Sequence, residues 1–197
     1  MTPQLVPGED PAVSPSADRA VATAQVGAVA PGDDGLEADR LLIAELVHSH
    51  PDIADRTCRP GHLTGSALVV DDSGERLALL FHRKLRRWLQ PGGHADGDTN
   101  LASVALREAT EETGLGGLRV DPRALDLDIH LVRPPGEDAH LHLDLRFLVV
   151  APRGAVLHGN HESEDLRWVR WDELDAYEPD AGLVRLAAAA RRAVGPG

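Results

Sequence analysis

The stretch between residues 91 and 115 constrains this chain more than any other part of its sequence. It opens with a Gly-Gly pair at positions 92 and 93, whose backbone can approach a ligand closely because glycine has no Cβ. The residues from Asn100 to Thr113 favour a helix, and Gly114 stands where a left-handed residue ends one. The sequence therefore predicts a loop, a helix and a sharp stop in close succession.

Three glutamates crowd one face of this predicted helix. Glu108, Glu111 and Glu112 are spaced i, i+3 and i+4, so their carboxylates lie within one turn and repel one another. The neighbouring Arg107 supplies one positive charge, which does not balance three negative ones. A divalent Mg²⁺ or Mn²⁺ ion would, because such hard cations prefer oxygen ligands. The alternative is a solvated acidic face, and the residues alone leave both open.

Acidic residues outnumber basic ones over the whole chain, with 32 Asp and Glu against 20 Lys and Arg and a net charge of -12. Nucleic acids and anionic membranes bind to basic surfaces, so we expect neither as a partner. A single cysteine, Cys58, excludes an internal disulfide and a cysteine-rich zinc site. The apolar runs are too short to cross a bilayer and the acidic N-terminus does not resemble a secretory signal, so we expect a cytoplasmic protein.

Residues 1–34 differ in composition from the rest. They are rich in Pro, Ala, Gly, Ser and Asp, and they contain neither Phe nor Trp. Such a segment offers little apolar surface to offset the entropy lost on ordering. We therefore predict a disordered N-terminal tail over residues 1–34 and a single folded domain over residues 35–197. A wrongly assigned start of the chain is the alternative explanation of this composition.

The remainder mixes strand and helix signals. A hairpin turn is expected at Asp71–Gly74, between two apolar runs. The expected strands cover residues 64–70, 76–82, 125–132, 140–150 and 166–169. The expected helices cover residues 36–50 and 100–113, and a third begins after Asp180 and ends at Gly195. This order predicts an α/β or α+β sandwich with a mixed sheet.

The expected strand over residues 140–150 alternates apolar and polar side chains. His140, His142 and Asp144 share its polar face, a spacing that can bind a transition metal. We expect these residues instead to line a substrate cleft or to face solvent.

Several of these residues together form a recognisable signature. The chain resembles the Nudix hydrolase family, whose box motif is matched at Gly93, Arg107, Glu108, Glu111, Glu112, Gly114 and Leu115. Three further segments resemble a bacterial subgroup of that family: Trp88–His94, His140–Phe147 and Trp168–Leu174. The resemblance extends over about residues 60 to 190 and leaves the predicted tail outside it.

The resemblance implies an α/β/α sandwich with a mixed sheet, and hydrolysis of a diphosphate bond in a nucleoside diphosphate linked to another moiety. By position, Glu108, Glu111 and Glu112 are the implied ligands of Mg²⁺ or Mn²⁺, with a backbone carbonyl near Gly92 completing the metal shell. Arg107 is implied to orient a glutamate through a salt bridge. One departure stands out, because Thr99 occupies the position where the box has a further glutamate. The neighbouring Asp96 and Asp98 are candidates to replace it.

Other residues are expected to contact the substrate or to assist the reaction. A general base or extra ligand is implied in a loop downstream of the box, where Glu162 and Glu164 are the candidates; a polar surface loop is the alternative. Arg83 and Arg87 belong to the densest basic run of the chain and are expected to contact phosphate, unless that run is simply solvated. His94 and His142 are expected to contact the substrate as well.

Two other functions fit the same signature. A nucleotide-binding or regulatory module of this fold would bind without cleaving, but it would be expected to have lost the glutamates. An isomerase of this fold acting on isoprenoid diphosphates would need a catalytic cysteine near the site, and Cys58 lies outside any matching context. The identity of the small-molecule substrate is open, and a homodimer is an open alternative to a monomer.

Overall fold

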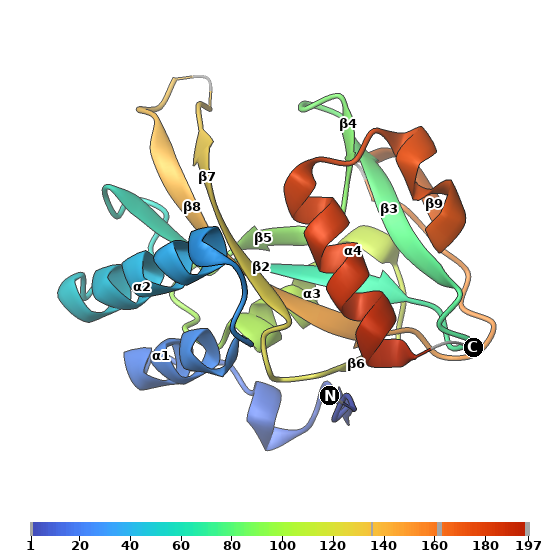
Figure 1. The fold of residues 1–197 in the computed structure, drawn as a ribbon, viewed down its shortest axis with the longest axis horizontal. Coiled ribbons are helices and arrows are strands. Elements are labelled where there is room, and N and C mark those ends of the chain that lie inside the picture. Colours follow the sequence, from blue (N-terminus) through green and yellow to red (C-terminus); the bar gives the residue numbers. More distant parts are fainter. Residues whose placement is uncertain (1, 135, 161–162, 196–197) are drawn as a thin grey trace.

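Figure 1 shows the computed structural model of the protein, which describes residues 2–134, 136–160 and 163–195. The strands are β1 (Val6–Pro7), β2 (Gly61–Val70), β3 (Arg76–His82), β4 (Arg87–Leu89), β5 (Gly92–His94), β6 (Arg119–Val120), β7 (Asp126–Val132), β8 (His140–Val150) and β9 (Ser163–Arg170). The helices are α1 (Arg19–Ala28), α2 (Asp34–Ser49), α3 (Leu101–Thr113) and α4 (Ala181–Val194), with 3₁₀ turns η1 (Pro11–Val13) and η2 (Trp171–Tyr177).

The described strands form one mixed sheet around β2. β2 runs parallel to β8 over its whole length, and β7 pairs with the other edge of β8 in the antiparallel sense. β3 continues the sheet on the other side, where it pairs with β4 and β9. The short β5 pairs with the first half of β2. The mixed sheet predicted from the sequence is confirmed.

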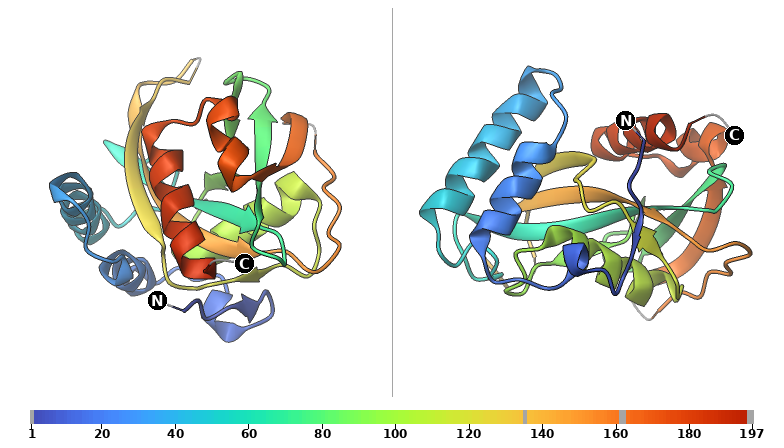
Figure 2. Two further views of the ribbon diagram at one scale, coloured as in Figure 1. Left: turned by 45° about the vertical axis from the view of Figure 1, so that its right-hand side comes forward. Right: turned by 90° about the horizontal axis from the view of Figure 1, so that it is seen from below.

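Helices cover both faces of this sheet. In the right-hand view of Figure 2, α3 lies on one side and α4 on the other. Alternate residues of each strand face the two layers: Leu63 and Leu143 belong to the core cluster with α3, whereas Leu68 and Leu148 belong to the cluster with α4. The predicted α/β/α sandwich is therefore confirmed. No helix of the described ranges has the length and apolarity needed to span a bilayer.

Most predicted elements lie within a few residues of their predicted bounds. The helix that carries the glutamates ends as expected at Gly114, which adopts the left-handed conformation with φ of 66°. Asp180 caps α4, because its carboxylate accepts a hydrogen bond from the Leu183 amide at 2.8 Å. The hairpin turn before β3 is held by Asp71, whose carboxylate accepts hydrogen bonds from the Glu75 and Arg76 amides.

The structure corrects the prediction that residues 1–34 are a disordered tail. β1 extends the sheet by pairing with β6, and α1 lies beside α2 (Figure 1). Val13, Val26 and Val29 are at most 5% exposed and belong to the core cluster on the α3 side. The apolar side chains of this segment are small and few, but Val13, Val26 and Val29 are buried, which composition alone does not show.

Side chains from later in the sequence hold this N-terminal segment in place. The Thr99 hydroxyl donates to the backbone carbonyls of Ser16 and Asp18, at 3.0 and 2.8 Å. Gln25 on α1 pairs with Asn100 at 2.8 Å, and its side-chain oxygen accepts from the first amide of α3, that of Leu101, at 2.9 Å. α1 thus caps the N-terminus of the helix that carries the glutamates.

Candidate functional site

The short strand β5 separates two polar regions of the molecule. Its backbone is flanked by the carboxylates of α3 on one side and by the polar face of β2 on the other. A Cβ at Gly93 would lie 2.5–2.6 Å from the carboxyl atoms of Glu108, and a Cβ at Gly92 would lie 2.4 Å from the Ser66 hydroxyl. Both approaches need glycine, so the Gly-Gly pair lets the glutamates come close to the β5 backbone.

Two of the three glutamates converge on β5 and are held there. Glu112 is 5% exposed, and its carboxylate accepts a hydrogen bond from the Gly92 amide at 2.9 Å. The Arg107 guanidinium donates to Glu108 at 2.9 Å and to the His94 carbonyl oxygen at 2.8 Å. Arg107 therefore ties a glutamate to β5, in the salt bridge that the family resemblance implies. Glu111, on the same helical turn, is exposed.

The donor set around β5 fits a hard divalent cation. Glu108 and Glu112 are spaced by one helical turn and bring two like charges to the same short strand, whose carbonyl groups are further oxygen donors. The lack of space for a Cβ at Gly93 shows that the close approach of Glu108 to the backbone is built into the fold. Among the described residues, the carboxylates of the three glutamates do not all lie close enough together to hold one ion as they stand. The group whose ligand atoms do lie that close consists of three histidines.

Substituting Gly93 by alanine is expected to displace the Glu108 carboxylate without unfolding the chain, because the end of a flexible side chain can move aside. We expect activity to fall about tenfold to a hundredfold, the effect typical of misplacing a reacting group by about 1 Å. Gly116→Ala is the matched control, since nothing lies within 4 Å of a Cβ at that position. Rates measured beside thermal midpoints test this, and equal activity of the two variants would contradict it.

The residues near the missing box glutamate have structural partners. Thr99 is 3% exposed and bonds to the N-terminal segment, as described above. Asp98 accepts hydrogen bonds from the Ser16 and Asn100 amides, and Asp96 pairs with Arg56. Both predicted replacements thus already have partners elsewhere in the chain, Asp98 in the N-terminal segment and Asp96 in Arg56.

The predicted phosphate-binding arginines lie in the loop and strand that follow β3. Arg83 is exposed, and Arg87 pairs with Asp180 at the N-terminus of α4. Their neighbour Arg86 pairs with Glu164. Glu162, the predicted general base, lies outside the described residues.

The polar face of β8 is divided between an ionic network and a histidine cluster. Asp144 accepts from the hydroxyls of Thr64 and Ser66, each at 2.9 Å, and from Arg146 at 2.8 Å. Arg146 and Arg185 of α4 both reach Asp128 at 3.1 Å. Asp144 therefore helps to join α4 to the sheet, and it does not share a ligand group with the histidines of its strand.

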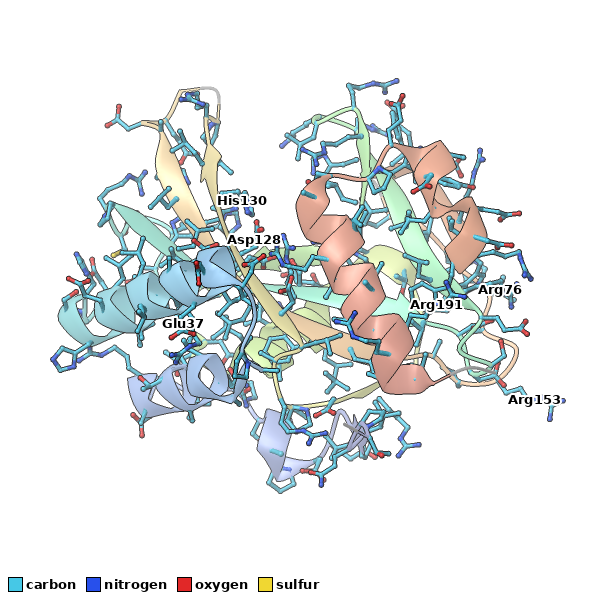
Figure 3. All side chains as sticks on the ribbon, in the orientation of Figure 1. Glu37, Arg76, Asp128, His130, Arg153 and Arg191 are labelled. Atoms are coloured by element: carbon cyan, nitrogen blue, oxygen red, sulfur yellow. The ribbon has the colours of Figure 1, made fainter. Side chains whose placement is uncertain are left out.

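The histidine cluster includes His62, a residue that the sequence analysis did not predict. His142 lies beside His62 of β2 and His94 of β5, with ring centroids 5.0 and 5.1 Å away. His140 packs against His62 at 4.9 Å, and His130 packs against His142 at 5.2 Å (Figure 3 labels His130 beside Asp128 on β7). The parallel register of His62 with His142 brings the two together, and this pairing of distant strands leaves no local pattern in the sequence.

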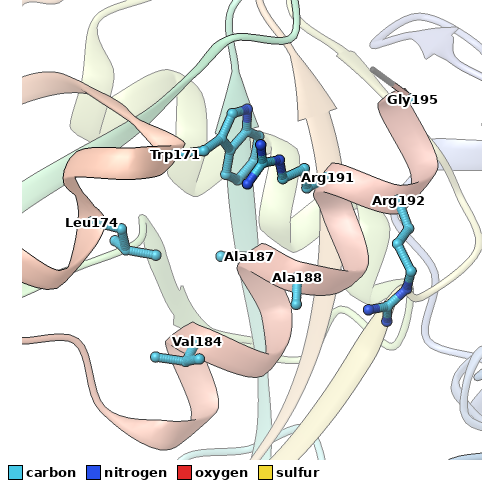
Figure 4. A pocket seen from close by; sticks show the side chains of 8 residues that line it. All are labelled: Trp171, Leu174, Val184, Ala187, Ala188, Arg191, Arg192 and Gly195. Carbon is cyan, nitrogen blue, oxygen red and sulfur yellow. The ribbon is translucent and has the colours of Figure 1, made fainter. Parts of the chain in front are cut away.

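A separate hollow lies between η2 and α4 (Figure 4). Its lining includes Trp171, Leu174 and Ala187, with Arg191 and Arg192 at the last turn of α4. The hollow lies on the face of the sheet opposite α3, and none of the described residues that line it is acidic. The candidate site is therefore at β5 and α3.

Comparison with known proteins gives a match over most of the chain. A family model described as the NUDIX domain matches residues 61–192. A Mycobacterium tuberculosis protein with the provisional name 8-oxo-dGTP diphosphatase 3 is 33% identical over 108 residues, which make up 51% of this chain and 48% of that protein. The chain spans about half the length of the curated relatives it matches.

Solved structures show the same fold. A C. elegans Ap4A hydrolase superposes with a TM-score of 0.56 and 15% identity, covering 67% of this chain and 96% of that one. The NUDIX domain of Shewanella oneidensis NrtR, solved with ADP ribose, superposes with a TM-score of 0.54 and 18% identity, covering 77% and 98%. The family match covers well over half of the chain, includes the glutamate helix and agrees with the resemblance found in the sequence. The chain therefore belongs to the Nudix hydrolase family.

Proposed function

We propose that this chain hydrolyses a diphosphate bond in a nucleoside diphosphate linked to another moiety, with Mg²⁺ or Mn²⁺ held by Glu108, Glu111 and Glu112. The observation that carries this proposal is the convergence of two glutamates on β5. Glu108 is fixed by Arg107, and Glu112 is fixed by the Gly92 amide. A purely solvated acidic face would not need its carboxylates held against a glycine backbone.

The residues of the site have distinct parts in this proposal. Arg107 keeps the Glu108 carboxylate directed at β5, and the Gly92 amide does the same for Glu112. The exposed Glu111 completes the acidic set, and the Gly92 carbonyl adds a neutral oxygen. A divalent cation bound there would neutralise charge on the diphosphate oxygens and lower the pKa of the attacking water. Hydrolysis adds that water across the P–O–P bridge, giving two phosphate-bearing products.

Substrate contacts are proposed for both sides of β5. Arg83 is exposed and precedes β5 in the sequence, so its guanidinium can pair with a phosphate group. Arg87 would have to leave its ion pair with Asp180 before it could bind phosphate. His94 and His142 line the polar face of the sheet beside β5, where they can contact the substrate. We keep Glu162 as the proposed general base, because Glu164 is already neutralised by Arg86.

The test is a substrate screen with purified full-length chain in Mg²⁺ or Mn²⁺, scored by the masses of the products. The set includes ADP ribose, a dinucleoside polyphosphate and 8-oxo-dGTP, which are the compounds that the names of the relatives mention. We expect metal-dependent cleavage of at least one compound at a diphosphate bond. Tight binding of a nucleotide without any cleavage would instead support the regulatory module.

A further inference from the structure

Three histidines from three strands meet on the side of β5 that faces away from α3. His62 comes from β2, His94 from β5 and His142 from β8. Each offers a ring nitrogen, and these nitrogens all lie within 4.8 Å of one another. The ligand atoms of these three side chains are close enough together to hold one metal ion. Among the described residues, no other such group of His, Cys, Asp or Glu is found.

The most buried of the three histidines has no hydrogen-bonding partner. His62 is 1% exposed, and neither of its ring nitrogens makes a hydrogen bond in the described structure. A buried polar atom left without a partner is energetically unfavourable, so such atoms are rare and usually have an explanation. An ion between the three rings would supply that partner.

Burial also favours the neutral form of the three histidines. Burial, reinforced by the neighbouring histidines, lowers the pKa of His62 to about 4 and that of His142 to about 3. Burial lowers the pKa of His94 too.

We propose that His62, His94 and His142 bind one transition-metal ion, with Zn²⁺ as the best fit, at a site distinct from the glutamates of α3. Three neutral imidazoles suit Zn²⁺ and its neighbours in the first transition row, whereas Mg²⁺ prefers oxygen. Zn–N bonds of about 2.0–2.1 Å in a tetrahedron place the nitrogens about 3.4 Å apart, so the rings need to close only slightly. The fourth position is left for water or a substrate oxygen.

Neighbouring groups provide an outer shell for this site. The His140 ring lies 4.9 Å from that of His62, and its Nδ1 is 2.8 Å from the Asp138 carbonyl oxygen. His130 packs against His142 and is itself paired with Asp128 at 3.1 Å. These ring contacts pack His62 and His142 in place. The bound ion would clamp β5 to β2 and β8, and so fix the Gly-Gly pair from the side opposite the glutamates.

The site is tested by metal titration of the full-length chain after stripping with a chelator. With Mg²⁺ in excess, we expect one equivalent of Zn²⁺ to bind and to raise the thermal midpoint. His94→Ala and His142→Ala should each weaken Zn²⁺ binding by more than about 100-fold, beyond the 10–100-fold that outer-shell changes usually cause. His48→Ala, an exposed histidine on α2, is the matched control and should bind as wild type does.

Two further measurements keep the outcome decisive. Co²⁺ bound to the wild-type chain should give the intense visible absorption bands of a tetrahedral, nitrogen-rich site. This measurement uses the wild-type chain alone, so its result does not depend on whether a variant folds. Glu112→Gln should leave Zn²⁺ binding unchanged, so that failure of the hydrolytic site and failure of the histidine site are distinguished. The absence of stoichiometric Zn²⁺ binding, or binding undiminished in both histidine variants, would overturn the proposal.

Discussion

Replacing Glu112 by glutamine is expected to lower the rate of hydrolysis by about two orders of magnitude or more while the chain stays folded. Glutamine preserves the size of the side chain and an oxygen that can accept from the Gly92 amide. It removes one charge from the proposed cation site, and a hundredfold change in rate corresponds to about 2.7 kcal/mol of transition-state stabilisation. Steady-state rates in Mg²⁺ and Mn²⁺ measure the effect.

The same substitution separates the proposed site from a merely acidic surface. Without metal, loss of one charge relieves the repulsion between Glu108 and Glu112, so the thermal midpoint should stay level or rise. Activity and stability are thus expected to move in opposite directions. Glu45→Gln on α2 is the matched control, because it removes an exposed helical glutamate far from the site in sequence. An active Glu112→Gln enzyme would contradict the account.

Deleting residues 1–32 is expected to destabilise the protein strongly. Val13, Val26 and Val29 are buried, and burial of such a side chain contributes about 1.5–3 kcal/mol before the entropy of ordering the segment is subtracted. We expect a net loss of about 3 kcal/mol, or roughly 6–12 °C in the thermal midpoint of a chain of this size. Activity should fall as well, because the deletion removes the Gln25 cap from α3.

A pair of point substitutions tests the same packing without shortening the chain. Val26→Ala on α1 removes a side chain that is 1% exposed, whereas Val184→Ala makes the same change where the side chain is 46% exposed on α4. Both sites are helical, so the change in helix propensity is matched. Only Val26→Ala should lower the thermal midpoint. Full stability of the deleted chain would restore the interpretation of residues 1–34 as a tail.

The glutamate helix shows how much of the site could be predicted. The sequence predicts where this helix starts, that it stops at Gly114 and that its glutamates share one face. All three features depend on residues that are close together in the chain, so a local pattern reveals them. The longer strands were predictable for the same reason, since alternation in β8 is a local pattern, whereas the short β1, β4, β5 and β6 were not predicted. The hydrogen bond of Glu112 with the Gly92 amide and the approach of Glu108 to Gly93 were not predicted, because they join residues of different elements.

The remaining features depend on contacts between distant residues. α1 is held by Thr99 and Asn100, whose hydrogen bonds with the N-terminal segment join positions more than seventy residues apart. His62 lies on β2, and only the register of β2 with β8 brings it to His142. No composition or periodicity within residues 1–34 or around His62 carries that information.

If the glutamates of α3 enable water to cleave a diphosphate bond, labelled water will enter a product only when they are intact. Turnover of the substrate found in the screen is followed in H₂¹⁸O with Mg²⁺ or Mn²⁺, for the wild-type chain and for the Glu111→Gln, Glu112→Gln double variant. We predict that wild type places one ¹⁸O in one phosphate-bearing product, loses this activity in EDTA and regains it with metal. The folded double variant should incorporate no label above background. Undiminished turnover by the double variant would contradict the account.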